Sequence, residues 1–440
     1  MKPKRRSTHL GRTFRTSVLA AALTLPTLSA ARAETTATTT AAALPALPSP
    51  LKPADVVKYA SEHRAEIAAA SAKTAALAQV PKQVGALPEP MVMASIDHLP
   101  ISLEGVNLSL MVQQEFPLSG VLGARERSAE ADVKGAAAKA QTVKLDVEFQ
   151  ALAAYLMVVE AQRMTTVLDE QVAIAKQMVA VTKARLLSSE AATLDILRAE
   201  LDSAKMEGER KALDSDLRAA ASMLEAALGR PVKGDPPVCD LTFPTGEPPT
   251  LPDLVKFALE KRPELSQMRA SVSKAQAEVD VMNSMYGPMA FVRLGGATTM
   301  MEGPGVMLMV GVNIPLWREK LGAGVAEAKA MGQMASAETT AMSTMIEGEV
   351  GSARQGVVAA RTRLATVRDK VLPLSKSVLT LTISTYATGH VPFVSVLEAA
   401  KAVRDARMEE VIAEVKLAAA WARLGRAVGD MNVGSPATKT

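Results

Sequence analysis

Residues 57–67 read V-K-Y-A-S-E-H-R-A-E-I, and residues 255–265 read V-K-F-A-L-E-K-R-P-E-L. Three further blocks recur in the same order at offsets of 198 to 200 positions: residues 116–118 match 314–316, residues 194–199 match 393–399, and Leu224 and Gly229 match Leu424 and Gly429. Four blocks in one order rarely arise by chance. The sequence therefore predicts a tandem repeat of one unit of about 200 residues.

Each copy is predicted to hold a short helix, two strands, a very long helix, a break and a further helix. Apolar and polar residues alternate along residues 106–116 and 306–314, which is the pattern of strands with one apolar face. A third strand is expected at 289–298, joined to the fourth by a turn at 302–305, and the weakest strand within 91–99. The short helices are expected at residues 53–80 and 251–284. Each clear strand has the roughly 9 to 11 residues that a tilted strand needs to cross a bilayer.

The long helices are predicted from the lack of proline. Residues 120–187 contain none, and their counterpart, residues 321–387, contains only Pro373. About 65 residues at 1.5 Å each make a rod of roughly 100 Å. Two apolar stripes run along the first long helix, so it is expected to pack against a neighbour on each side: Leu145, Phe149, Leu152, Leu156 and Val159, and Val147, Ala151, Ala154 and Val158. An ordinary antiparallel coiled coil would explain these helices but not the strands.

The first 33 residues are interpreted as a signal peptide for ordinary secretion, with a basic start, an apolar stretch at 17–30 and an Ala31-Arg32-Ala33 cleavage site. The chain has 50 basic and 46 acidic residues. Seven basic residues and no acidic residue lie in the leader, so the mature chain has 43 against 46 and a net charge of −3. The basic isoelectric point belongs to the leader, and no nucleic-acid partner is predicted.

Composition argues against an enzyme. Cys239 is the single cysteine, which excludes an internal disulfide, and it is interpreted as a small apolar loop residue. Aromatic residues make up 3% of the chain, which favours close-packed helices over an aromatic-cored enzyme. The histidines are scattered, and no G-x-S-x-G, P-loop or C-x-x-C motif is present, so no catalytic residue and no cofactor is predicted. The four histidines are His9, His63, His98 and His390.

The chain is accordingly divided into a signal peptide at 1–33, a first repeat at 34–230, a linker at 231–250, a second repeat at 251–430 and a flexible tail at 431–440. Outside the leader no apolar run is long enough for a membrane helix. Four strands cannot close a membrane barrel, so identical chains are expected to pool their strands. Eight strands from a dimer would be filled by side chains, whereas twelve from a trimer leave a water-filled lumen.

This order of elements resembles the TolC-like outer-membrane efflux proteins over nearly the whole mature chain. Three local motifs carry the same resemblance: residues 113–117 (Q-Q-E-F-P) before the long helix, residues 262–265 (R-P-E-L) at the start of the repeat, and residues 386–389 (Y-A-T-G) followed by 396–399 (V-L-E-A). The first copy departs from the family at residues 187–190 (L-S-S-E), where a glycine is usual at the tip.

The resemblance implies a mainly α fold with a membrane β-barrel contribution, in which the duplicated unit forms a trimeric α/β barrel channel-tunnel. It implies an exit duct of a tripartite efflux pump that conducts small solutes or metal cations passively. The expected partners are two further copies of the chain, a periplasmic adaptor (membrane fusion) protein, an inner-membrane efflux pump and outer-membrane lipid. The location implied is the outer membrane of a Gram-negative-type cell, with the helices in the periplasm. The alternatives are a type I protein-secretion channel and a periplasmic adaptor with a long coiled-coil hairpin.

The resemblance also implies a gate at the periplasmic end. Glu398 is the candidate carboxylate of a ring, and Ser395, three residues earlier, stands where a second acid is common. The repeat aligns Asp195 with Ser395 and Arg198 with Glu398, so Glu398–Arg198 and Tyr386–Asp195 links between neighbouring hairpins are expected. Solvated charges on an exposed helix are the alternative interpretation. Gly389, Ser188 and Ser189 are the candidate adaptor-docking tip.

Methionines gather in and around the predicted strands. They are Met91, Met93 and Met111 in the first copy and Met282, Met285, Met289, Met300, Met301, Met307 and Met309 in the second. Thioethers suit copper(I) and silver(I), but methionine also fills apolar, lipid-facing or interstrand space. Because no histidine or cysteine accompanies them, the second interpretation is preferred and no metal site is predicted.

Overall fold

The computed structural model describes residues 45–97, 107–187, 192–299 and 303–432, so the predicted signal peptide lies outside the described residues. All helices and strands belong to one unit, Ala46–Thr440. The first half contains α1 (Pro53–His63), α2 (Ala65–Leu77), α3 (Val80–Val84), β1 (Met91–Asp97), β2 (Asn107–Pro117), α4 (Val121–Leu187) and α5 (Thr193–Ala227). The second half contains α6 (Leu251–Lys261), α7 (Pro263–Ser284), β3 (Met289–Thr299), β4 (Gly303–Asn313), α8 (Arg318–Thr366), the π-helical turn η1 (Val367–Val371), α9 (Leu372–Ala387) and α10 (Phe393–Val428). Both halves therefore run through the same order of elements, as the internal repeat predicts.

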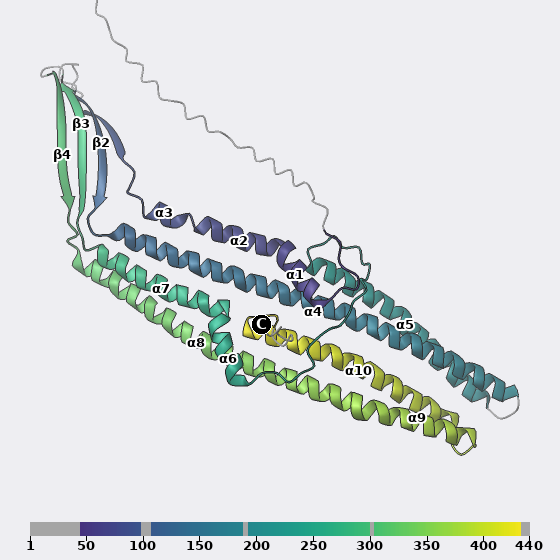
Figure 1. Cartoon of the computed structure of the whole chain (residues 1–440). Coiled ribbons are helices and arrows are strands. Elements are labelled where there is room, and N and C mark those ends of the chain that lie inside the picture. Colours follow the sequence, from purple (N-terminus) through teal and green to yellow (C-terminus); the bar gives the residue numbers. More distant parts are fainter. Residues whose placement is uncertain (1–44, 98–106, 188–191, 300–302, 433–440) are drawn as a thin grey trace, which may run out of the picture. The chain divides into compact units, whose positions relative to one another are not determined.

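The four strands form one antiparallel sheet in the order β1-β2-β3-β4, in which the β2–β3 pair joins the two copies (Figure 1). All four strands lie within a few residues of their predicted positions, and alternation predicts two of them, β2 and β4. The predicted turn at 302–305 is wrong in part: Gly303 pairs with Thr299, so Gly303 to Gly305 begin β4. Glu302 lies outside the described residues. Gly303 has a φ of +79°, which a glycine adopts without strain.

The short helix predicted at the start of each copy is in fact two helices. The break falls at Arg64 between α1 and α2, and at Arg262 between α6 and α7, and both residues have extended backbone. Pro263 explains the second break, because a residue before proline is pushed out of helical conformation. In both copies the arginine at the break donates to a glutamate two residues later, Glu66 or Glu264.

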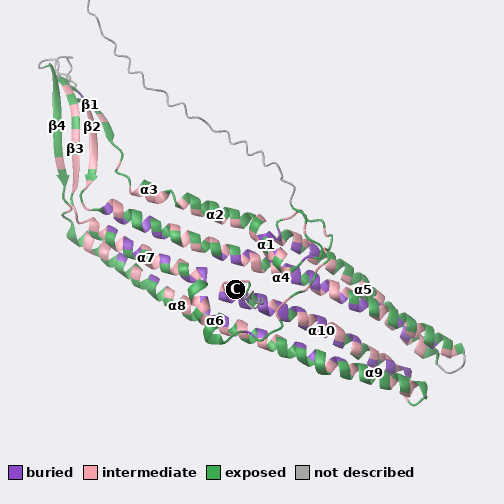
Figure 2. Cartoon of the chain, viewed as in Figure 1, coloured by how far each residue is buried: buried purple, intermediate pink, exposed green. Residues whose placement is uncertain are grey.

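The long helices pack as the apolar stripes predict. α4 lies against α5, α7 and α10, and α8 lies against α7 and α10. Seven of the nine stripe residues of α4 are buried, and Phe149 and Leu152 are half-buried (Figure 2). Tyr155, which neither stripe includes, is fully buried and its hydroxyl donates to the carbonyl groups of Leu51 and Asp240. The middle of α4 is therefore the centre of the first core.

In each copy a short helix packs against a long helix and contributes to its hydrophobic core. α1 contributes Val56 and Ala60 to a cluster with Val158 of α4, and α6 contributes Leu254 and Ala258 to a cluster with Val350 of α8. Burying each large aliphatic side chain stabilises the fold by about 2 kcal/mol. The duplication thus extends from the order of elements to the packing of the core.

Pro373 does not end the second long helix. The helix continues from α8 into α9 through η1, a π-helical turn directly before the proline. Proline lacks an N–H and its ring clashes with the carbonyl group four residues earlier, so a wider turn accommodates it. Within the described residues, no helix combines the length and the apolar character that crossing a membrane would require.

Candidate functional site

The ends of two helical hairpins, α4–α5 and α9–α10, carry the residues that the sequence singles out. The turn between α9 and α10 requires a glycine at position 389. The backbone N–H of Gly389 donates to the carbonyl of Tyr386 at 3.0 Å, and that of His390 donates to Thr385 at 3.1 Å. These two bonds cap the end of α9 and require a left-handed residue at position 389, where φ is +77°. Ser188 and Ser189, at the end of the first hairpin, lie outside the described residues.

Glu398 and Ser395 lie in the first turns of α10, three residues apart on one helix face. Glu398 is exposed and Ser395 is half-buried. Val396 and Ala399, between and beside them, are buried and hold this part of α10 against the protein. Among the described residues of a single chain, Glu398 forms no ion pair, so its carboxylate is available to solvent.

Asp195 and Arg198 occupy the corresponding turn of α5. They form an ion pair with each other, with Arg198 Nη1 at 3.9 Å from Asp195 Oδ1. Tyr386 instead stacks under the guanidinium of Arg185, whose Cζ lies 4.5 Å from the ring centroid, and its ring lies 5.8 Å from that of Phe393. In the part of the chain that the structure describes, Glu398 and Arg198 do not pair, and neither do Tyr386 and Asp195. The contacts of Tyr386 with Arg185 and Phe393 are ones that the sequence did not predict.

Charged side chains tie the hairpins together closer to the π-helical turn. Glu414 of α10 accepts from Arg163 of α4 and from Arg368 of η1, and Arg368 also lies 3.2 Å from Glu410. Arg363 of α8 donates to Glu409 at 2.9 Å. These pairs link α4, α8, η1 and α10 around the place where the second long helix changes its winding.

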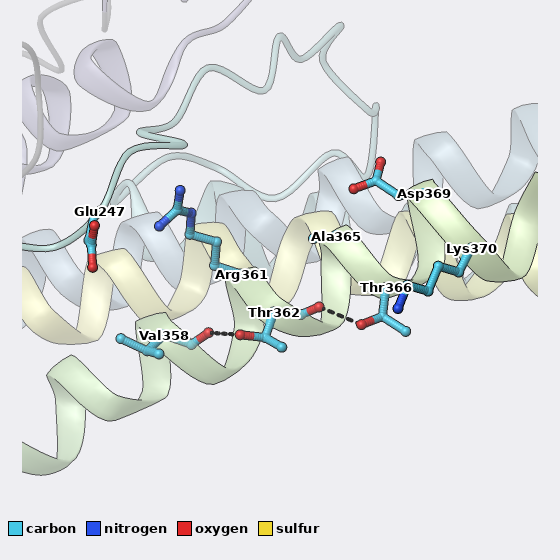
Figure 3. Close-up of a pocket in the computed structure, with 8 residues that line it drawn as sticks. All are labelled: Glu247, Val358, Arg361, Thr362, Ala365, Thr366, Asp369 and Lys370. Atoms are coloured by element: carbon cyan, nitrogen blue, oxygen red, sulfur yellow. Dashed lines mark hydrogen bonds between the residues drawn. The ribbon is translucent and has the colours of Figure 1, made fainter.

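A shallow cavity of about 350 Å³ lies against the same turn (Figure 3). Arg361 and Lys370 line it with Glu247 and Asp369, so charges of both signs meet there. The hydroxyl groups of Thr362 and Thr366 donate back to the carbonyl groups of Val358 and Thr362 at 2.9 Å each. The threonines are thus engaged by their own helix and are not arranged as nucleophiles.

The R-P-E-L motif proves to be a structural junction. Arg262, which is buried, donates to Glu264 at 3.2 Å and also to Glu349 of α8. Arg426 of α10 donates to Glu264 at 2.7 Å and to Asp146 of α4 at 2.7 Å. Burial raises the pKa of Glu264, but hydrogen bonds from Arg262, from the backbone and from Arg426 outweigh it and bring the pKa down to about 2. Glu264 therefore holds α7, α8, α10 and α4 together as a carboxylate.

Clusters of hard and nitrogen ligands were sought among the described residues. No group of three or more His, Cys, Asp or Glu side chains that could hold a metal ion is found in residues 45–97, 107–187, 192–299 and 303–432.

Comparison with known proteins is consistent with this geometry. Residues 254–430 match the family model of the outer membrane efflux protein. The solved structure of the outer-membrane channel OprN has a TM-score of 0.71 at 17% identity, covering 86% of this chain and 89% of that chain. CusC, which forms a transmembrane channel, has a TM-score of 0.75 at 14% identity, covering 86% and 92%. VceC, an outer membrane protein from Vibrio cholerae, has a TM-score of 0.72 at 14% identity, covering 86% and 96%.

No match was found among curated proteins. The matching family and these structural neighbours are membrane channel proteins rather than enzymes. Their identities are low, so the likeness to the solved structures concerns the fold. Residues 254–430 thus match the outer membrane efflux protein family, and the chain as a whole has the fold of the TolC-like efflux channels.

Proposed function

We propose that this chain is one of three identical subunits of an outer-membrane exit duct, which passes small solutes or metal cations from an inner-membrane pump and its periplasmic adaptor. The proposal rests on the observation that a single chain leaves strand edges unpaired and apolar helix surfaces uncovered. Among the described residues the sheet has two open edges, and α5 and α9, which lie away from the sheet, expose apolar side chains (Figure 1).

The sheet supports this most directly. Within the described part of the chain, β1 and β4 each pair on one side only. β4 is exposed along nearly its whole length, with 86% of Val306 and 67% of Leu308 and Val310 accessible. An open apolar edge invites pairing with another strand, and in lipid it would leave backbone groups unsatisfied. Pairing of β4 with β1 of the next copy removes both edges at once.

The helices show the same incompleteness. α9 exposes Leu374, Val378 and Leu381, and α5 exposes Leu194, Leu197 and Leu201, each by more than half. Exposed apolar patches of this kind mark interaction surfaces. Three chains would supply twelve strands, enough for an aqueous lumen, whereas two would supply eight and a filled barrel. The periplasmic-adaptor alternative, with one hairpin, does not account for two hairpins joined to a shared sheet.

In such an assembly the hairpin tips surround the axis. Three Glu398 carboxylates would then form a ring whose field favours cations. The Tyr386–Asp195 and Glu398–Arg198 pairs, which do not form within one chain, would link hairpins of neighbouring chains and hold the tips closed. Gly389, Ser188 and Ser189 would form the surface that meets the adaptor.

Conductance in planar bilayers tests the proposal. The full mature protein, extracted in detergent, should insert and give small, stepwise currents. Changing Tyr386→Phe with Arg198→Ser should enlarge each step, because it removes both kinds of link while sparing the apolar seams. The exposed pair Arg127–Asp280 offers a matched control, since Arg127→Ser breaks an ion pair of 3.0 Å far from the tips in sequence. Absence of current from parent and double variant alike would refute the duct.

A further inference from the structure

The register of the sheet sorts its side chains into two very different faces. Paired residues share a face, and successive residues along a strand alternate. One face is mainly apolar across all four strands, with Gln114 and Thr298 as its polar members: Val92 and Ile96 of β1, Leu108, Leu110 and Val112 of β2, Val292 and Leu294 of β3, and Val306, Leu308 and Val310 of β4. The opposite face carries Ser95, Ser109, Gln113, Glu115, Arg293 and Asn313.

All six methionines of the described strands lie on this second, polar face. They are Met91, Met93, Met111, Met289, Met307 and Met309. Methionine that merely filled apolar or lipid-facing space would belong on the apolar face, where none is found in the described strands. Their placement therefore needs another explanation, and it could not be read from the alternation of single strands.

Three of the six form one row across the sheet. Met93 pairs with Met111, Met111 pairs with Gly295, and Gly295 pairs with Met307. Adjacent strands are about 4.8 Å apart, so Met93 and Met111 are direct neighbours, while Met111 and Met307 are separated by one strand.

Gly295 lies in the gap between Met111 and Met307 and has no side chain to fill it. A Cβ atom at this position would lie 2.6 Å from Cγ of Met111, so the Met111 side chain already lies over the glycine. The Met111 side chain is thus directed towards β3, and Met307 of the next strand lies opposite Gly295. Because position 295 has no side chain, the space between Met111 and Met307 is left to their thioethers.

The polar side chains on either side of this row are hydrogen-bonded to one another and not to the methionines. Arg293, one row away, donates to Oε1 of Gln113 at 3.1 and 2.6 Å, and Gln113 donates to Glu115 at 3.2 Å. On the other side Ser95 and Ser109 are hydrogen-bonded to each other at 2.7 Å. The row of Met91 and Met309 contains the Arg293 cation, which would oppose a bound metal ion, so it is the less suitable of the two.

We propose that Met93, Met111 and Met307 form a binding site for a soft monovalent metal ion, copper(I) or silver(I), on the polar face of the sheet. Neutral thioethers are ligands that such ions prefer over the hard oxygen ligands of Mg²⁺ or Ca²⁺. Met307 is 39% exposed, and Met93 and Met111 are half-buried, so an ion can reach the row from the open face. All three ligands belong to one chain, so binding itself does not require the proposed trimer. That the bound ion would face a pore does rest on the proposed function.

Silver(I) is the appropriate probe because it does not change oxidation state in air. The experiment uses the full mature chain in detergent with Cys239→Ala, since the single thiol would bind silver(I) by itself. We expect about one silver ion per chain by calorimetry. Replacing all three methionines by leucine, which keeps their volume, should weaken binding at least about tenfold. Leucine at Met331, Met334 and Met345, three exposed methionines of α8, should leave it unchanged.

Equal silver binding by the two triple variants would overturn the site. X-ray absorption by silver bound to the chain with only Cys239 replaced gives a second measurement that needs no methionine variant. Sulfur neighbours are expected, and a shell of oxygen and nitrogen alone would overturn the proposal. Neither measurement depends on ion conduction or on the number of chains, so failure here is distinguishable from failure of the duct.

Discussion

At the scale of single residues, Glu264 is expected to contribute strongly to the stability of the fold. It accepts hydrogen bonds from Arg262 and Arg426, and its side chain is 15% exposed. Glu264→Gln should destabilise the protein by about 2 kcal/mol, because it weakens charge-assisted hydrogen bonds to two arginines. The internal repeat supplies a matched control: Glu66 pairs with Arg64 in the same way but is 52% exposed. Glu66→Gln should cost well under 1 kcal/mol. Equal losses in thermal unfolding would contradict this.

The same carboxylate predicts a dependence on pH. The pKa of Glu264 is about 2 in the folded chain, against an ordinary value of 4.5. A depressed pKa stabilises the folded state above the ordinary value, and this contribution is lost as the pH falls from about 4.5 towards 2. Acidification through this window should therefore lower the unfolding temperature of the parent more steeply than that of Glu264→Gln. Parallel curves for the two proteins would argue that Glu264 is not held ionised.

Two glycines of the second copy should respond to alanine with opposite signs. Gly389 has a φ of +77° in the capping turn of α9, and alanine there should cost about 1 kcal/mol. Gly348 lies within α8, and a Cβ atom there meets nothing within 4 Å. Gly348→Ala should stabilise the helix by roughly 0.5 to 1 kcal/mol. Thermal unfolding of both variants checks the pair, and destabilisation by Gly348→Ala would show that this face needs a glycine.

At the scale of helices and strands, the proposed gate at the start of α10 can be tested by itself. Glu398 is exposed at the start of α10 and has no ion-pair partner among the described residues of its own chain. Glu398→Lys should reverse or abolish a preference for cations in planar bilayers, because it replaces a ring of negative charges by positive ones. Glu347→Lys changes an exposed glutamate on α8 instead and should leave ion preference as it is. If Glu398→Lys keeps the parent's preference, Glu398 is a solvated surface charge.

Elements were predictable where a period defines them. The alternation along residues 106–116 predicts β2 within one residue at each end, because a half-buried strand repeats every second residue. The break at Arg64 was not predictable, since no proline or glycine follows it. The π-helical turn has only Pro373 as a signal, and a proline predicts disturbance of a helix without saying whether the helix stops or continues.

Contacts between distant segments were the hardest to predict. Arg185 and Tyr386 are 201 positions apart, and the repeat aligned Tyr386 with no arginine, so their stacking required the fold. The methionine row required more still: alternation assigns each strand a face, but only the register brings Met93, Met111 and Met307 into line. The apolar stripes of α4, by contrast, were predicted from spacing alone, and the tip glycine from the resemblance of residues 386–389 to a family motif.

At the scale of the whole molecule, the open edges of β1 and β4 and the exposed apolar residues of α5 and α9 call for further copies of the chain. The proposal that three chains close one duct is the central claim, since the gate and the lumen depend on it. The most direct test is to count the chains per particle in protein extracted from the outer-membrane fraction, using light scattering or native mass spectrometry. We expect three chains per particle. A water-soluble, monodisperse monomer after removal of the leader would contradict it.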